Sequence, residues 1–290
     1  MIGLKRGTVQ LYDHEKVWEE EAQRTIKRLW DILGCIATDI QHVGSTSILT
    51  IKAKPIIDIA VAVNDFNDIL AIEQELKANG FYYRPKSELG EQLLFASGNL
   101  YEGTGDIQTH FIHVVLTDSM EWRNYINFRD YLNNNPIVAK AYEELKISLA
   151  NAAPVDAGRE QYLAGKHDFI VYTLRKAMVY SFLGKTVEIE IDRPIGTVHP
   201  KHDDIIYPIN YGYIPGVLGG DGEELDVYVL GESEPVNKCL VRIIGIVHRR
   251  NDVEDKLVGA VNDMTYSAEE IASAVRFQEQ FYDSYVEVTQ

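Results

Sequence analysis

The sequence has little cysteine and no long hydrophobic run. Its two cysteines, Cys35 and Cys239, lie far apart with no metal-ligand spacing, so we interpret them as small buried thiols in a reducing compartment. The apolar run at residues 56–63 contains Asp58 and is too short to cross a bilayer. The first residues lack the apolar segment of a secretory signal. These absences predict a cytoplasmic protein without a membrane partner.

Positive charge is also scarce, because 28 Lys and Arg residues face 44 Asp and Glu residues, a net charge of -16. This imbalance disfavours binding to a nucleic-acid backbone. It is concentrated in residues 178–290, where nine basic residues face 20 acidic ones, a net of -11. An acidic domain that acts on an anionic substrate needs metal ions between the two, so we consider divalent cations as partners.

The length of 290 residues and the 46% hydrophobic content predict about two globular domains. The residue pattern changes near residue 177, from long helical patterns to short β-rich runs separated by Gly, Asp and Asn. We therefore predict one domain over residues 1–177 and a second over residues 178–290.

The first domain alternates helical and strand patterns. A helix over residues 15–33 shows one apolar stripe, with Asp13 able to cap its start and Gly34 to end it. We expect strands at residues 56–63 and 110–116, and further helices at residues 67–79, 120–132, 136–150 and 160–177. Strands followed by helices predict an α/β (α+β) domain, a small sheet backed by a helical layer.

The second domain shows the pattern of a small β-barrel with a C-terminal helix. Ser267 and Glu270 form a capping-box signature at the start of that helix. The strands are expected at residues 186–191, 205–213, 226–230, 240–248 and 256–261.

Carboxylates in this domain gather in two loops, each leading into a strand. Residues 207–231 contain YPINYGY followed by DGEELD, with Asp221, Glu223 and Asp226, and residues 251–260 read NDVEDKLVGA. Carboxylates with water and phosphate are the ligands that Mg²⁺ prefers, so two such loops can build one metal cavity. Taken alone, DGEELD can equally be a solvated turn.

YPINYGY followed by DGEELD resembles the signature of the family I soluble inorganic pyrophosphatases, over residues 186–285. The resemblance implies a five-stranded OB-like barrel, Mg²⁺ (or Mn²⁺) as cofactor and pyrophosphate as substrate. It implies a catalytic set of Glu223, Lys256 and Tyr211, with Glu223 activating the attacking water. The implied metal ligands are Asp221 and Asp226, with the second acidic loop contributed by Asp252, Glu254 or Asp255.

The resemblance is incomplete on the phosphate side. The family's lysine-bearing hairpin after the first strand is missing, and Arg193 comes earlier than the family's arginine. We assign phosphate binding to Lys201, Arg193 and Glu190, with Glu188 an alternative to Glu190. For Lys201 an exposed polar turn is the competing interpretation.

A second motif lies in the first domain, where His42-Val43-Gly44-Ser45-Thr46-Ser47 precedes Lys54 and Asp58. A Gly-Ser loop can present N–H groups to a phosphate, and a carboxylate on the next strand can hold its metal. Together with Trp122, residues 128–132, Lys166 and Phe169, this motif resembles the GrpB family, which implies a nucleotidyltransferase-like fold. The implied ligand site comprises His42, Gly44, Ser45, Lys54 and Asp58.

Nucleotidyl transfer needs a pair of carboxylates, and the second position here is Ala60. Glu121, His110 or His113 could substitute. We expect binding of a nucleotide or phosphate but no transfer.

The sequence thus predicts an enzyme that hydrolyses pyrophosphate or a related phosphoanhydride, fused to a domain that binds a nucleotide-like small molecule. The alternative is a binding protein in which both sites have lost turnover. The sequence leaves open whether the protein forms a homo-oligomer.

The domain assignment predicts that residues 1–176 and 180–290 fold when expressed separately, because each is large enough for its own core. Each fragment should give a cooperative thermal melt and dispersed NMR signals. An unfolded fragment beside a folded full chain would contradict the assignment.

Overall fold

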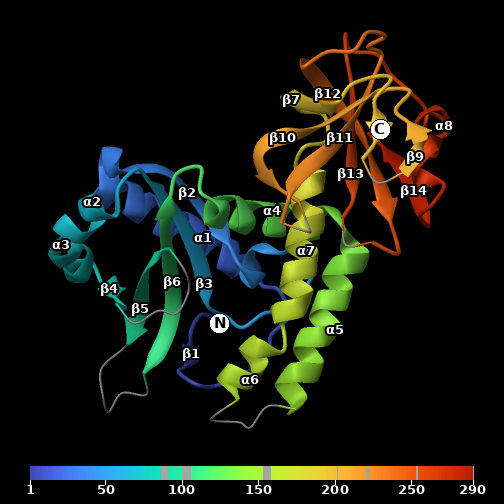
Figure 1. Ribbon diagram of the computed structural model, residues 1–290. Helices are drawn as coiled ribbons and strands as arrows, with labels where there is room; N and C mark the ends of the chain where they lie inside the picture. The colour runs from blue at the N-terminus through green and yellow to red at the C-terminus, as the bar shows by residue number, and fades with distance from the viewer. Residues whose placement is uncertain are drawn as a thin grey trace. The chain divides into compact units, whose positions relative to one another are not determined.

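The computed structural model describes residues 1–85, 91–99, 106–152, 158–200, 202–219, 222–252 and 254–289. The chain divides into two compact units, Met1–Leu174 and Arg175–Gln290, which confirms the predicted two-domain organisation (Figure 1). The division falls within helix α7 (His167–Tyr180). Within the described ranges, no helix is long and apolar enough to cross a membrane.

The N-terminal unit is built on a six-stranded sheet with strand order β2-β3-β6-β5-β4 and β1 paired to β6. Strands β3 and β6 are parallel, and the other neighbours are antiparallel. The strands are β1 (Leu4–Lys5), β2 (Ala37–Val43), β3 (Ile57–Val63), β4 (Tyr82–Tyr83), β5 (Leu93–Asn99) and β6 (Ile107–Leu116).

Helices cover both faces of this sheet (Figure 1). Alternate residues of β3 point to opposite faces, so Ile57, Ile59, Val61 and Val63 join the core with helix α1, while Asp58 and Ala60 face the other way. The α1 side contains α1 (Lys16–Leu33), α2 (Phe66–Ala71) and α3 (Glu73–Ala78). The remaining helices are α4 (Met120–Asn134), α5 (Pro136–Ala152), α6 (Arg159–Ala164) and α7.

Several local predictions for this unit are wrong. Asp13 does not cap α1, because the N-cap residue is Glu15 and Asp13 instead pairs with Lys52. Gly34 does end the helix, with a positive φ of 53°. The helix predicted at residues 67–79 breaks at Ile72, and the one at 160–177 is two helices, α6 and α7.

The thiols are also less buried than predicted, since Cys35 is exposed and Cys239 is half-buried.

The C-terminal unit is a closed five-stranded barrel with a C-terminal helix, as predicted. The order is β13-β11-β10-β7-β12, and pairing of β12 with β13 closes the ring. Strand β14 (Ser284–Val288) pairs antiparallel with the last residues of β12, outside the ring. Strand β8 (Val198–His199) pairs with β9 (His202–Ile206) in a separate two-stranded sheet. The barrel strands are β7 (Thr186–Arg193), β10 (Asn210–Leu218), β11 (Glu224–Leu230), β12 (Lys238–Arg249) and β13 (Lys256–Ala260).

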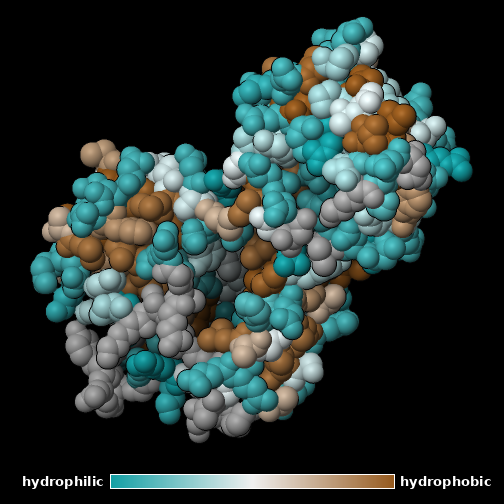
Figure 2. Space-filling view, viewed as in Figure 1, coloured by the Kyte–Doolittle hydropathy of each residue, from teal (hydrophilic) through white to brown (hydrophobic). Residues whose placement is uncertain are grey.

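Helix α8 (Ala268–Glu279) starts at Ser267 with the predicted capping box. The strand predicted at residues 205–213 is in fact two, because residues 207–209 separate β9 from β10, and β14 was not predicted. Hydrophilic residues cover much of the visible face of this unit, in line with its charge (Figure 2).

A buried ion pair ties the end of α8 to the barrel. The Arg249 guanidinium donates to both carboxylate oxygens of Glu279, at 2.6–3.2 Å, and the two side chains are 3% and 5% exposed. The Tyr228 hydroxyl donates to the same carboxylate at 2.6 Å, and the centre of the Tyr282 ring lies 3.7 Å from the guanidinium carbon. Loss of either charge would leave the other buried without its partner.

We predict that Glu279→Gln lowers the free energy of unfolding by about 3 kcal/mol, because the buried charge of Arg249 would keep only Asp252, whose side chain is 29% exposed, as an anionic partner. Urea denaturation of the full chain measures this change. The matched control is Glu269→Gln in the exposed first turn of α8, which should cost less than about 1 kcal/mol. Equal effects of the two substitutions would contradict the role of the pair.

Candidate functional sites

Four predicted residues meet at one end of the barrel strands. Parallel pairing of Val227 with Leu257 puts the residues before them, Asp226 and Lys256, at the same level. The Lys256 ammonium donates to the carboxylates of both Asp226 and Glu254. Lys256 and Glu254 are buried, whereas the side chain of Asp226 is 26% exposed and reaches solvent.

Tyr211 completes this group, which we call the barrel cluster: Tyr211, Asp226, Glu254 and Lys256. Tyr211 pairs with Tyr228 across β10 and β11, so it lies diagonally opposite Asp226 on the same face. Its hydroxyl is hydrogen-bonded to Asp226, and burial together with that charge raises the pKa of Tyr211 well above its ordinary value. The hydroxyl therefore stays protonated and acts as a donor.

The structure adds Asp192, which sequence reasoning missed, to the edge of the barrel cluster. Burial, reinforced by the negative charge of Asp226, raises the pKa of Asp192 against the opposing effect of Arg193. Arg193 pairs with Asp192 and is hydrogen-bonded to Tyr207. The available signal was position, because Asp192 directly precedes the arginine that was singled out.

The second acidic loop divides its carboxylates among different cations. Glu254 faces Lys256, whereas Asp252 accepts from Arg249 Nη1 at 3.0 Å. Asp255 is bonded to His248 Nδ1 at 2.8 Å and to Lys176 Nζ at 2.6 Å. Burial alone would raise the pKa of Asp255, but these two bonds outweigh it and hold the pKa below its usual range.

Glu190 and Glu223 were also predicted as site residues of this unit. Glu190 pairs with Lys238 at 2.9 Å and accepts from the Tyr213 hydroxyl at 3.0 Å. Glu223 lies in an exposed bend, where its carbonyl accepts the N–H of Gly219 at 2.6 Å. A Cβ on Gly219 would lie 2.5 Å from Glu254 Oε1, so this loop passes directly beside Glu254. Asp221 and Lys201 lie outside the described residues.

The donor chemistry of the barrel cluster fits Mg²⁺. Carboxylates are the protein ligands this ion takes, and Asp192 and Asp226 lie close enough that the charge of Asp226 adds to burial in raising the pKa of Asp192. Within the described ranges, no three His, Cys, Asp or Glu side chains are already arranged to hold a metal.

The N-terminal unit contains a cavity of about 370 Å³ on the face of the sheet opposite α1. Gly44 lies at its wall, before the 3₁₀ turn η2 (Ser45–Ser47). Glycine is required there because φ is +70° and a Cβ would lie 2.4 Å from Asp58 Oδ2. The cavity, here called the N-terminal pocket, is lined by Gly44, Ser45, Asp58, Gln92, His113, Glu121, Asn124, Tyr125, Phe128, Tyr142, Lys166, Ile170 and Leu174.

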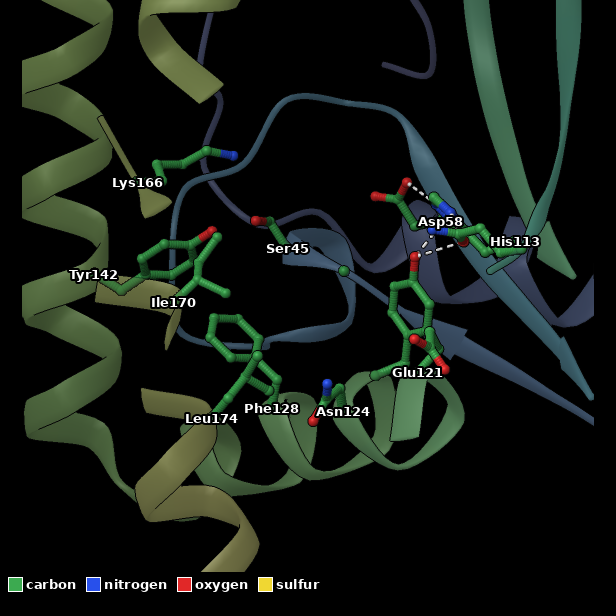
Figure 3. A pocket seen from close by; sticks show the side chains of 13 residues that line it. Ser45, Asp58, His113, Glu121, Asn124, Phe128, Tyr142, Lys166, Ile170 and Leu174 are labelled. Atoms are coloured by element: carbon green, nitrogen blue, oxygen red, sulfur yellow. Dashed lines mark hydrogen bonds and ion pairs between the residues drawn. The ribbon is translucent and has the colours of Figure 1, made fainter. Parts of the chain in front are cut away.

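Asp58 is hydrogen-bonded to a histidine in this pocket (Figure 3). His113 Nε2 lies 3.2 Å from Asp58 Oδ1, and its Nδ1 lies 2.9 Å from the hydroxyl of Tyr125. That hydroxyl donates to Gln92 at 3.0 Å. His113, one of the residues that we considered as a substitute for the absent second carboxylate, thus faces Asp58, while Ala60 is fully buried.

Not every predicted residue of the N-terminal site lines the pocket. His42 contacts Thr46 at 3.0 Å in a different hollow, and burial lowers its pKa to about 4, so it is neutral. The Lys54 ammonium lies over the Tyr162 ring. Lys166, which belongs to the residues that resemble the GrpB family but not to the predicted ligand site, does line the pocket.

Comparison with known proteins identifies the two units. The family model described as GrpB protein matches residues 8–176, and the model described as inorganic pyrophosphatase matches residues 180–287. The chain belongs to the GrpB family and carries a pyrophosphatase-like C-terminal unit, which confirms both resemblances.

Individual relatives agree with this assignment. The glutamate-rich protein GrpB of Alkalihalophilus pseudofirmus is 37% identical over 171 residues, 59% of this chain and 96% of the relative. The crystal structure of GrpB from Enterococcus faecalis is 28% identical with a TM-score of 0.53, covering 59% of this chain and 99% of that one. The soluble inorganic pyrophosphatase of Oryza sativa subsp. indica is 31% identical over 87 residues, which span 28% of this chain but only 41% of the rice protein.

Proposed function

We propose that the C-terminal unit hydrolyses pyrophosphate or a related phosphoanhydride in the presence of Mg²⁺ or Mn²⁺. The observation that carries the proposal is the convergence of Tyr211, Asp226, Glu254 and Lys256 in a unit that matches inorganic pyrophosphatases. A cation, a protonated hydroxyl and carboxylates in one place supply what a phosphoanhydride needs for charge neutralisation and proton transfer.

Asp226 and Glu254 would hold the metal, with Asp192 and Asp221 as further candidates. When bound, Mg²⁺ offsets the charge of the substrate and lowers the pKa of a coordinated water. Lys256 would turn from the carboxylates to a phosphate oxygen, and Tyr211 would donate its hydroxyl proton in a hydrogen bond to another. We assign Glu223 as the base that accepts the proton of the attacking water, since it lies in the exposed loop beside Glu254.

The pairing of the cations with carboxylates favours a second candidate, a phosphate-binding protein without turnover. Lys256 is held by Asp226 and Glu254, and Arg193 by Asp192, so each cation already has an anionic partner. The lysine-bearing hairpin of the pyrophosphatases is also missing from the sequence. Turnover separates the two candidates.

For the N-terminal unit we propose binding of a nucleotide or phosphate in the N-terminal pocket, without nucleotidyl transfer. Asp58 lies in the pocket wall beside Gly44, but Ala60 occupies the position of a second carboxylate and His113 is bonded to Asp58 instead. A histidine beside one carboxylate supports binding better than two-metal chemistry. We also propose a cytoplasmic location, supported by the scarcity of cysteine.

The proposal predicts release of phosphate from pyrophosphate with Mg²⁺, and loss of most of that activity in Asp226→Asn. The lost charge weakens metal binding, so excess Mg²⁺ should restore part of the rate. Glu223→Gln should instead lower kcat by roughly 10²–10⁴-fold at unchanged metal requirement. A colorimetric phosphate assay with Mg²⁺, Mn²⁺ and Co²⁺ measures each effect.

The matched control is Asp263→Asn, the same change at an exposed position of the same unit, which should leave the rate unchanged. Thermal melts should show all three variants folded. A parent protein that binds pyrophosphate but releases no phosphate with any of the three metals would support the binding protein.

A further inference from the structure

One face of helix α4 lines the N-terminal pocket with polar side chains. Residues three and four apart share a face of a helix, and the stripe formed by Glu121, Asn124, Tyr125 and Phe128 lines the cavity. Toward the end of α4 the same stripe is apolar, because Phe128 and Leu132 pack together in a hydrophobic cluster. At its start, a glutamate and an asparagine occupy the positions that face the cavity.

Glu121 and Asn124 are both half-buried, and neither has a hydrogen bond or an ion pair to the part of the chain that the structure describes. Tyr125 differs from them, because its hydroxyl donates to Gln92 at 3.0 Å and lies 2.9 Å from His113 Nδ1. Polar groups that face a cavity without a protein partner are available to a ligand. The Glu121 carboxylate offers two acceptor oxygens, and the Asn124 amide offers one acceptor and two N–H donors.

The end of the pocket near Glu121 is negatively charged. Burial raises the pKa of Tyr125, and the charges of Asp58 and Glu121 add to this increase, against the opposing effect of the bond to Gln92. Asp58 is bonded to His113 at 3.2 Å, whereas Glu121 has no cationic partner within the described ranges. A phosphate is disfavoured beside this carboxylate, and N–H donors are favoured.

The arrangement on α4 suits a flat, donor-rich group. Figure 3 shows Glu121, Asn124 and Phe128 following one another along the helix and extending toward the cavity. A carboxylate can accept two parallel N–H bonds, and the neighbouring amide supplies a donor that the carboxylate lacks. The Phe128 ring adds an apolar surface against which an aromatic ligand can pack. The cavity of about 370 Å³ has the size of a small-molecule site.

We infer that the N-terminal pocket recognises guanine: the Glu121 carboxylate accepts the ring N–H and the 2-amino group, the Asn124 amide donates to the carbonyl oxygen, and the base packs against Phe128. The inference rests on the proposed nucleotide binding by the N-terminal unit and names the base. Among the common nucleobases, guanine places two N–H donors side by side and next to a carbonyl. Adenine and cytosine have a ring-nitrogen acceptor, and uracil a carbonyl, where guanine has its second donor.

Titration calorimetry of the full chain with GMP, IMP and AMP tests this inference. The three nucleotides share the sugar and phosphate, so differences in affinity report on the base. None has a phosphoanhydride bond, so hydrolysis by the C-terminal unit does not interfere. IMP lacks the 2-amino group and AMP lacks both donors of the guanine edge. We expect the affinity to fall about tenfold from GMP to IMP and about a hundred-fold from GMP to AMP.

Two substitutions locate the contacts. Glu121→Gln should weaken GMP binding about ten- to a hundred-fold and bring the affinity for GMP close to that for IMP, because charge-assisted hydrogen bonds are lost. Asn124→Ala should weaken GMP and IMP alike, about two- to tenfold, because both carry the carbonyl. Both variants should melt like the parent, since neither side chain has a protein partner to lose. The matched control, Glu75→Gln at an exposed position of α3, should change none of the affinities.

The inference is wrong if GMP and AMP bind equally, or if Glu121→Gln keeps the full preference for GMP over IMP. Binding of methylguanidine, a donor-rich cation, with no binding of GMP would also contradict it. Equal binding of all three nucleotides would leave the proposed nucleotide site intact and overturn the assignment of guanine alone. No binding of any of them would contradict both. None of these results depends on pyrophosphate hydrolysis.

Discussion

The arrangement of the barrel cluster depends on one buried ammonium, that of Lys256, held between the carboxylates of Asp226 and Glu254. Desolvation opposes this charge, and the two carboxylates outweigh that effect and raise the pKa of Lys256. Parallel pairing of β11 with β13 sets the level of Asp226 and Lys256, and closure of β13 onto β12 completes the ring around them. The register of these strands thus sets the position of the barrel cluster, where we propose that phosphate and metal bind.

The same requirement, that a buried charge needs a partner, distributes the other charged residues. Neighbouring carboxylates at Asp252, Glu254 and Asp255 reach three different cations. Two of these cations have a structural role: Arg249, the partner of Asp252, also holds the end of α8 through Glu279, and Lys176 in α7 pairs with Asp255. The loop beyond β12 therefore contributes one carboxylate to the barrel cluster and uses the others for structure.

The sequence predicted best what local pattern encodes. Four of the five barrel strands were placed to within two residues because β-branched runs alternate with Gly, Asp and Asn, whereas the run at residues 205–213 merged β9 with the start of β10. The capping box located the start of α8. Strand β2 (ATDIQHV) was missed because its buried apolar residues, Ala37, Ile40 and Val43, recur every third residue and not every second. Asp192 was missed because only the pairing of β7 with β10 brings it to the barrel cluster, and the one signal in the sequence was its position before Arg193. In the acidic loop, residues that are close in sequence were expected to act together in one metal site, but their carboxylates face different cations.

The most direct test of the central claim is a crystal structure of the full chain with Mg²⁺ and imidodiphosphate, a pyrophosphate analogue that resists hydrolysis. The account predicts metal density at Asp226 and Glu254, with the Lys256 ammonium and the Tyr211 hydroxyl on phosphate oxygens. Lys256 still bridging the two carboxylates at saturating analogue, with no ligand density at the barrel cluster, would contradict it.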